Sequence, residues 1–342
     1  MTRARTGFSP LLAAALLAAC GAFAAPETVV AGTAHLANAV ADITGAEAAP
    51  FVLLPPAQCP GHYDARPGDI ARLSEAGVVL LHVWQRPMGN VRRALAAAAV
   101  PPERIIAVST PGNWMVPETQ QAGLREVAEI LARLHPDRAG AFRAAAERRA
   151  QAVAEHARAA RERVTAAGGT GLPVAVNEMQ APLVMWAGCT ASVVFGRGEE
   201  MGAAELAALA GDARKAGVRA VVNNLQSGNP KAAETLAAEL GVPLVTLSNF
   251  PGADPDASSW ESAFDRNLDR LLGADGIPVG RDVAELPLAV HLVAQAPELD
   301  VVGFGVPVLA TQVTVYGAGG VVAVLHKVPG CIRPAGAEVH RQ

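Results

Sequence analysis

The feature that most constrains the fold is a long stretch with almost no helix breaker, PDRAGAFRAAAERRAQAVAEHARAARERVTAA, at residues 136–167. Pro136 stands where a first helical turn tolerates proline, and Gly168 and Gly169 follow the last Ala. At ~1.5 Å per residue the predicted helix is roughly 45 Å long, and its charges can pair at a spacing of i,i+4. It is either a long surface helix or a rigid strut that joins two lobes.

Short β-branched runs alternate with helical stretches on both sides of this helix. TVVAG, FVLLPP, VVLLHVW and RIIAVS come before it, and PVAVN, ASVVFG, RAVVNN and PLVTLSNF come after it. Strands that alternate with helices predict parallel sheets. We therefore expect an α/β protein with two lobes of parallel sheet flanked by helices and joined by one long rigid linking helix.

The expected boundaries follow from this alternation. They are 28–135 for an N-terminal lobe, 136–167 for the linking helix, 171–274 for a C-terminal lobe, and 277–342 for a β-like tail. The tail has short apolar runs separated by Gly turns. It suits a small β appendage, a poorly ordered tail or a disrupted reading frame, and we leave it unassigned.

The N-terminus predicts export. MTRARTG carries two Arg and is followed by the short apolar segment FSPLLAAALLAAC, which is typical of a signal peptide. We expect it to span residues 1–24, or 1–19 if Cys20 is the lipidated residue of a lipoprotein. No later run reaches the ~18 apolar residues of a spanning helix, so any membrane attachment is expected only through a lipid anchor. The predicted location is the periplasm or cell envelope.

Composition narrows the class of partner. Hydrophobic residues are 51% and charged residues 18% of the 342, which is typical of a globular chain, and the net charge is −4. No basic stripe with interleaved aromatic residues occurs, so we expect no nucleic-acid partner. No Ser-His-Asp order, phosphate-binding Gly loop or HExxH segment occurs either, and we expect a monomeric binding protein and not an enzyme.

The stretch QCPGHYDARPGD, residues 58–69, places Cys59 three positions before His62 in a loop rich in Gly and Pro. A Cys-x-x-His turn can chelate a soft or borderline metal ion. The cysteines of the exported chain beyond the signal peptide are Cys59, Cys189 and Cys331, which favours one disulfide and one free thiol. A Cys59–Cys189 pair is one option, and the sequence leaves the pairing open.

Polar and aromatic residues gather at the predicted strand ends and in the loops beyond them, where parallel sheets place their ligands. The predicted cleft lining consists of Tyr63, Trp84, Gln85, Asn113, Trp114, Met179, Gln180, Asn223, Asn224, Gln226 and Asn249. Amides and Trp faces suit neutral polar or planar ligands, although Asn also favours ordinary turns. His35, His135 and His156 are expected to be structural or solvated.

Several stretches resemble one family. PGHYDARPGDIARLSEAGVVLLH, GNWMVPE and NLDRL occur in the order and spacing found in the zinc/manganese-type (cluster A-I) periplasmic solute-binding proteins of metal ABC transporters. The resemblance covers residues 28–274 and marks the chain as a divergent member. It implies two lobes with one divalent ion between them, bound by three His and one carboxylate from four loops.

The expected ligands do not carry over residue by residue. Gly61 and Gly112 stand where the family has two of its histidines, and VNEMQ, with Asn177, Glu178 and Met179, stands where it has the third. VVNNLQSG and LSNF replace the segments that usually hold the acidic ligand. A bound metal would therefore need a different set. We predict Cys59, His62, His82 and Glu178, because His82 ends a predicted strand and Glu178 follows another.

The resemblance implies the exported substrate-binding component of an ABC importer. It would capture a transition-metal ion, of zinc or manganese type, in the cleft between the lobes and deliver it to a membrane permease with its ATPase. One alternative keeps the fold but binds a metal chelate or a small organic ligand. Another, from a different class, is an envelope metallochaperone or redox protein that uses Cys59 and His62.

Overall fold

A computed structural model describes residues 28–45, 49–196 and 201–273, together with the backbone of three strands nearer the C-terminus. The chain divides into two units, residues 1–281 and 282–342. In the second unit β9 (Leu292–Gln295), β10 (Thr311–Gly317) and β11 (Gly320–Lys327) form an antiparallel sheet in the order β11-β10-β9. The predicted signal peptide, Cys20 and Cys331 lie outside the described residues.

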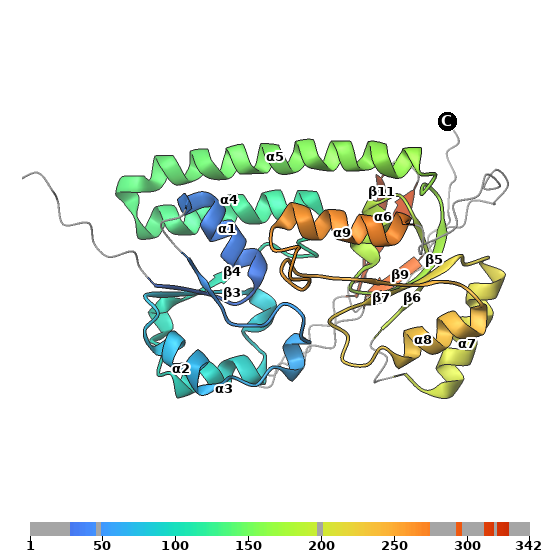
Figure 1. Cartoon of the computed structure of the whole chain (residues 1–342), viewed down its shortest axis with the longest axis horizontal. Helices are drawn as coiled ribbons and strands as arrows, with labels where there is room; N and C mark the ends of the chain where they lie inside the picture. Colours follow the sequence, from blue (N-terminus) through green and yellow to red (C-terminus); the bar gives the residue numbers. More distant parts are fainter. Residues whose placement is uncertain are drawn as a thin grey trace, which may run out of the picture. The chain divides into compact units, whose positions relative to one another are not determined.

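The N-terminal lobe is a parallel sheet with helices on both faces. Its elements are β1 (Val29–Ala31), α1 (Ala34–Thr44), β2 (Phe51–Val52), α2 (Pro67–Ser74), β3 (Val78–His82), α3 (Gly89–Ala97) and β4 (Ile105–Val108). The strand order is β2-β1-β3-β4, and every pair is parallel. The strands are β-branched and largely buried, as expected for a sheet covered on both sides. In Figure 1, α2 and α3 lie on the opposite side of this sheet from α1 and α4.

Two antiparallel helices follow. They are α4 (Pro117–Leu134) and α5 (Ala139–Ala166), separated by the 3₁₀ turn Pro136–Arg138. The 28 residues of α5 span about 42 Å at 1.5 Å each. Its buried stripe is made of mostly small residues at helical spacing, which lets α4 pack closely along it; the stripe is Phe142, Ala146, Ala150, Val153, Ala157, Ala160 and Val164.

The C-terminal lobe repeats the design. Its elements are β5 (Pro173–Asn177), α6 (Ala181–Trp186), β6 (Thr190–Phe195), α7 (Ala203–Lys215), β7 (Ala220–Asn224), α8 (Lys231–Leu240), β8 (Leu244–Leu247) and α9 (Trp260–Leu272). The strand order is β6-β5-β7-β8, again all parallel. The helix α5 packs on α1 of the N-terminal lobe and on α9 of the C-terminal lobe. The predicted fold class, two parallel-sheet lobes joined by one long helix, is confirmed.

One apolar core runs through both lobes on the side of α4 and α5. It contains Leu80 of β3, Leu124 of α4, Val153 of α5, Val222 of β7 and Phe264 of α9. Separate clusters fill the opposite face of each sheet, beneath α2 and α3 in one lobe and beneath α7 and α8 in the other. Because the shared core extends along α5, the linking helix is an integral part of the packing and not a flexible tether.

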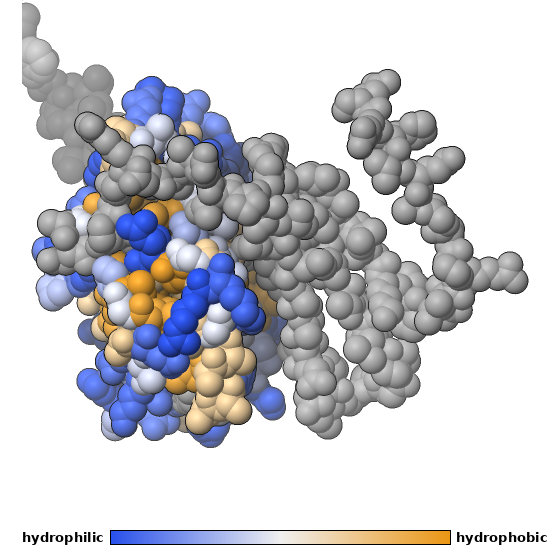
Figure 2. Space-filling model, turned by 90° about the vertical axis from the view of Figure 1, so that its right-hand side faces the viewer, coloured by the Kyte–Doolittle hydropathy of each residue, from blue (hydrophilic) through white to orange (hydrophobic). Residues whose placement is uncertain are grey.

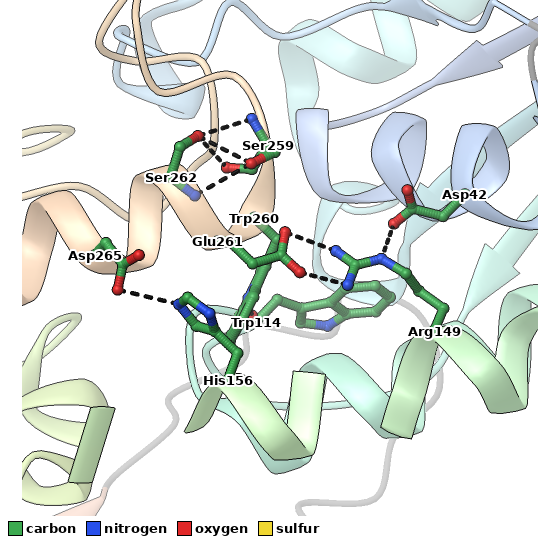
Figure 3. Close-up of polar contacts among 9 residues, drawn as sticks. All are labelled: Asp42, Trp114, Arg149, His156, Ser259, Trp260, Glu261, Ser262 and Asp265. Carbon is green, nitrogen blue, oxygen red and sulfur yellow. Dashed lines mark hydrogen bonds and ion pairs between the residues drawn. The ribbon is translucent and has the colours of Figure 1, made fainter. Parts of the chain in front are cut away.

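Ion pairs add to this contact between the lobes. Arg149 of α5 donates to Asp42 of α1 through Nε at 2.7 Å and to Glu261 of α9 through both terminal nitrogens. One turn further along α9, Asp265 contacts His156 Nε2 at 3.0 Å. Figure 3 shows Arg149 held between the two carboxylates. We call this set of contacts among α1, α5 and α9 the helical seam.

None of the helices in the described residues is long and apolar enough to cross a membrane. On the face shown in Figure 2, apolar residues gather in the middle of the visible surface with hydrophilic residues around them. The exposed large hydrophobic residues of the described chain are Val83, Trp84 and Met179. All three follow strand ends, which places them beside the site described next.

Candidate functional site

The carboxyl ends of the strands place a group of amides together. Asn113 follows β4, Gln180 follows β5, Asn224 ends β7, and Gln226 and Asn249 lie in the loops after β7 and β8. We call these five residues the amide cluster. They come from four loops of two lobes, as the rule for ligand positions in parallel sheets predicts.

Asn249 is the centre of the amide cluster. Its Oδ1 accepts hydrogen bonds from Asn113 Nδ2 and Gln180 Nε2, each at 3.0 Å. Its Nδ2 donates to Asn224 Oδ1 at 3.1 Å, and its backbone N–H donates to Gln226 Oε1 at 2.9 Å. Asn249 is 8% exposed, so these bonds are shielded from water and fix the side chains in one arrangement.

Hydrogen bonds at this edge also join the two lobes directly. Asn113 of the N-terminal lobe donates to the carbonyl of Met179 at 2.8 Å. Gln226 of the C-terminal lobe donates to the carbonyl of Pro56 at 2.7 Å. In this structure the lobes are therefore closed on one another, with neutral polar groups between them.

Two buried histidines adjoin the amide cluster. His35, in the first turn of α1, donates through Nε2 to the carbonyl of Asn249 at 2.7 Å. His82, the last residue of β3, shares a hydrogen bond of 2.9 Å between its Nε2 and the hydroxyl of Thr33. Both rings pack against Trp114, with centroid distances of 5.9 Å for His35 and 4.8 Å for His82. We call His35 and His82 the histidine pair.

Burial keeps the histidine pair neutral. Desolvation lowers the pKa of His35 to about 4, with the bond to the Asn249 carbonyl opposing this shift. Desolvation also lowers the pKa of His82 to about 3, further reduced by His35 and partly opposed by Glu126. Because the Nε2 of His35 donates to a carbonyl, a neutral His35 carries its proton there and keeps a lone pair on Nδ1.

Several buried polar atoms at the sheet edges have no hydrogen-bond partner. Among the described residues, the buried side-chain atoms without a hydrogen-bond partner are Nδ1 of His35, Nδ1 of His82, Oε1 of Gln180, and both amide atoms of Gln120. His35, His82 and Gln180 belong to the histidine pair and the amide cluster. A buried polar atom without a partner costs free energy, so its presence marks a place where another group can bind.

Several predicted cleft residues have structural roles instead. Gln85 is fully buried, accepts from the backbone N–H of His82 at 2.8 Å and donates to the carbonyl of Gly32 at 3.1 Å. A Cβ on Gly32 would lie 2.3 Å from Gln85 Oε1, so only glycine permits this contact. Tyr63 is buried too, and its hydroxyl donates to Asp69 at 2.7 Å within the N-terminal lobe. Asn223 lies inside β7, beside Asn224.

The predicted metal quartet is not brought together. Within the part of the chain that the structure describes, no three His, Cys, Asp or Glu side chains form a group able to hold a metal ion. His62 and Glu178 are exposed, whereas His82 is 3% exposed. The loop with Cys59 is fixed to the N-terminal lobe by Asn90, whose amide donates to the carbonyls of Pro60 and Tyr63. The quartet rests on closeness in sequence and on strand position, and the structure does not gather its members into one metal-binding group.

The cysteine pairing considered from the sequence is also absent. Cys59 and Cys189 are both free thiols. Burial raises the pKa of the Cys189 thiol to about 12, so it is not a reactive thiolate at neutral pH. These two residues therefore do not provide a disulfide for redox chemistry.

Sequence reasoning missed His35 and gave no role to Ser248. Ser248 precedes Asn249, and its hydroxyl accepts from Gln226 Nε2 at 3.0 Å. His35 follows β1 and Ser248 follows β8, so the positional rule that selected the amides applies to these two residues as well. A lone histidine in a first helical turn has many ordinary explanations, and its partner Asn249 is 214 residues away.

Two parallel-sheet lobes on a long linking helix, with polar groups between their carboxyl edges, define the fold of a periplasmic solute-binding protein. The chain matches the family described as ZnuA: Zinc-uptake complex component A periplasmic over residues 29–274. This is more than half of its 342 residues, and the chain therefore belongs to this family. The resemblance recognised from the sequence is confirmed.

Solved structures share the fold at low identity. The solute-binding protein FpvC of Pseudomonas aeruginosa, in complex with Ni²⁺, is 21% identical with a TM-score of 0.57, covering 72% of this chain and 96% of its own. TroA, the periplasmic zinc-binding protein of Treponema pallidum, is 19% identical with a TM-score of 0.59, at 73% and 99%. A ZnuA deletion mutant with zinc bound is 18% identical with a TM-score of 0.58, at 73% and 98%. No curated protein matches the sequence significantly.

Proposed function

We propose that this protein is the exported solute-binding component of an ABC importer for a transition metal, with its cargo held between the two lobes. Membership of the ZnuA family and the two-lobe fold support the general role. The same family membership supports a periplasmic location and delivery to a membrane permease with its ATPase. The metal is of the zinc or manganese type expected from the sequence.

The observation that carries the proposal is the pair of unpartnered Nδ1 atoms on His35 and His82. Neutral imidazole nitrogens are common ligands for zinc, nickel and related ions. A metal-binding His usually donates its other ring N–H to a carbonyl or carboxylate, which fixes the ring. His35 already makes such a bond, to the carbonyl of Asn249 at 2.7 Å. The histidine pair thus replaces the predicted quartet as the proposed metal-binding group.

Cargo reaches these buried rings when the lobes separate at the sheet edges. The bonds that must break there are Asn113 to Met179 and to Asn249, Gln226 to Pro56, and His35 to Asn249. The shared core along α5 stays intact and restricts the motion to a small one. Binding and release would therefore involve opening of the polar edge about the helical seam.

Metal content tests the proposal. The full chain is purified without added metal or chelator, and its metals are measured by mass spectrometry beside the His35→Gln, His82→Gln, His62→Gln and His135→Gln variants. We expect near-stoichiometric transition metal in the wild type, in His62→Gln and in His135→Gln, and a large loss in His35→Gln and His82→Gln. Loss in His62→Gln alone would return the metal to the Cys59–His62 loop. No metal in the wild type would contradict the proposed cargo.

A further inference from the structure

We propose that the cargo is a transition metal carried in a planar aromatic chelator, which lies against Trp84 and Met179 while the metal reaches the histidine pair. This rests on the proposed function and specifies its substrate class.

The first step concerns the number of metal ligands. Zinc in proteins typically takes about four ligands. His35 and His82 supply two nitrogens, and among the described residues no third His, Cys, Asp or Glu joins them. The neighbouring amide oxygens of Asn224 and Asn249 already accept hydrogen bonds. The remaining ligands can then come with the metal, as they do in a chelate that leaves two coordination positions open.

The second step concerns exposed apolar residues. Trp84 is 45% exposed and Val83 is 50% exposed, both directly after β3 of the N-terminal lobe. Met179 is 51% exposed, directly after β5 of the C-terminal lobe. They are the large hydrophobic residues that the described chain leaves exposed, and they lie at the ligand-binding edges of both sheets. Exposed apolar residues at the edge of a polar site can contact an apolar ligand.

The third step links these residues to the histidine pair. The Trp84 ring stacks on the His82 ring, with centroids 5.6 Å apart and planes at 14°. The His82 and Trp114 rings are in turn nearly perpendicular, at 84°, with centroids 4.8 Å apart. Asn113, next in sequence to Trp114, donates to the carbonyl of Met179. A continuous path of contacts therefore runs from the exposed residues of one lobe, past the histidine pair, to the exposed residue of the other.

The chemistry of these groups selects a planar aromatic ligand. An exposed indole offers a flat face for stacking, and a Met thioether makes favourable contacts with aromatic rings. The unpartnered Gln180 Oε1 can accept a hydrogen bond from an O–H or N–H of the chelator. A bare hydrated ion would make no stacking contact with the indole face.

Binding measurements with defined probes test this. The full chain is titrated with Zn²⁺ or Ni²⁺ as the chloride, and with equimolar complexes of each metal with phenanthroline, by equilibrium dialysis and by quenching of Trp fluorescence. We expect the complexes to bind about tenfold more tightly than the ions, in line with one aromatic stacking contact. Trp84→Ala should abolish this preference and Trp84→Phe should retain it. Trp84 is about half exposed, so both variants should fold.

Each outcome separates the chelate from the metal. Equal affinity for ion and complex, or a preference unchanged in Trp84→Ala, would overturn the chelate while leaving a metal cargo in place. Binding of the complexes that is unaffected by His35→Gln and His82→Gln would overturn the metal contact of the histidine pair and leave only an organic ligand. Binding of neither ion nor complex would overturn both.

Discussion

The two lobes meet in two places, and these differ in chemistry. At the helical seam, Arg149 lies between Asp42 and Glu261. In the adjoining apolar core, Trp260 of α9 donates to the carbonyl of Trp114, in the loop after β4, at 2.8 Å. At the sheet edges, the lobes meet through the amide cluster and the histidine pair, where buried atoms of His35, His82 and Gln180 have no partner. The polar groups named at the first contact are paired, and the second contact has unused donors and acceptors.

This difference indicates a division of roles. A fully partnered, apolar contact stabilises the closed arrangement whether or not a ligand is present. A polar contact with unpartnered buried atoms is less stable than it would be with a ligand that satisfies them. We therefore expect substitutions at the helical seam to affect folding most, and substitutions at the sheet edges to affect ligand binding.

The largest effect is expected at Trp260. This side chain is 1% exposed and stacks on Phe264 at 4.7 Å, so Trp260→Ala should destabilise the protein by about 3–5 kcal/mol. Urea unfolding followed by circular dichroism measures the change. Trp84→Ala is the matched control at the sheet edge, and a loss there below about 1 kcal/mol is expected. Equal losses at the two positions would remove the distinction between the helical seam and the sheet edges.

The second largest effect is expected on acidification, which should lower the free energy of unfolding through the histidine pair at the sheet edges. Burial lowers the pKa of His35 from 6.5 to about 4 and that of His82 from 6.5 to about 3. Between pH 6.5 and the lowered pKa of each histidine, the unfolded chain binds a proton that the folded chain does not. The stability from the two neutral histidines is therefore complete above pH 6.5 and is lost as the pH falls. Each histidine contributes about 1.4 kcal/mol per pH unit in this range.

The free energy of unfolding, measured by urea at pH 7, 6 and 5, checks the pH dependence. The slope should be smaller in His35→Gln and in His82→Gln, because a glutamine does not titrate. A slope that neither His35→Gln nor His82→Gln alters would show that other groups, such as the carboxylates, cause the pH dependence.

A smaller effect is expected at Arg149, whose side chain is 17% exposed. Arg149→Met leaves Asp42 and Glu261 half-buried without their shared cation. Because both carboxylates keep partial contact with water, the expected loss is about 2 kcal/mol, below the range for a fully buried pair. Thermal unfolding at low and high salt measures it. A variant as stable as the wild type would mean that the core alone holds the helical seam.

The smallest effect is expected at Arg143, also on α5. It pairs with Glu129 of α4 at 2.7 Å, with both side chains about half exposed. Solvent screens such pairs, so Arg143→Met should leave the unfolding midpoint unchanged within error. A clear decrease would show that charge on α5 stabilises the fold wherever it lies.

The fold could be predicted because it depends on periodic patterns. Runs such as VVLLH and RAVVNN are buried parallel strands, and residues 136–167 form the linking helix with a short 3₁₀ turn at its start. The amides of Asn113, Gln180 and Asn249 were placed correctly at strand ends, because the carboxyl ends of parallel strands share one edge.

The site was predicted only in part, because its contacts connect distant residues. Cys59 and His62 are neighbours in sequence, and Asn90 ties their loop to the N-terminal lobe. The structure does not bring these two residues and His82 together as a metal-binding group. Nothing local to His35 reveals its bond to Asn249. Gln85 looked like cleft lining, and only the close approach of Gly32 shows that it supports the strand ends.

X-ray absorption of the metal-loaded full chain would test most directly that the metal binds the histidine pair. We predict nitrogen and oxygen donors at about 2.0–2.1 Å with imidazole scattering, weaker in His35→Gln and in His82→Gln, and no sulfur. A sulfur shell at about 2.3 Å, or imidazole scattering that is lost only in His62→Gln, would contradict this and return the metal to the loop of Cys59 and His62.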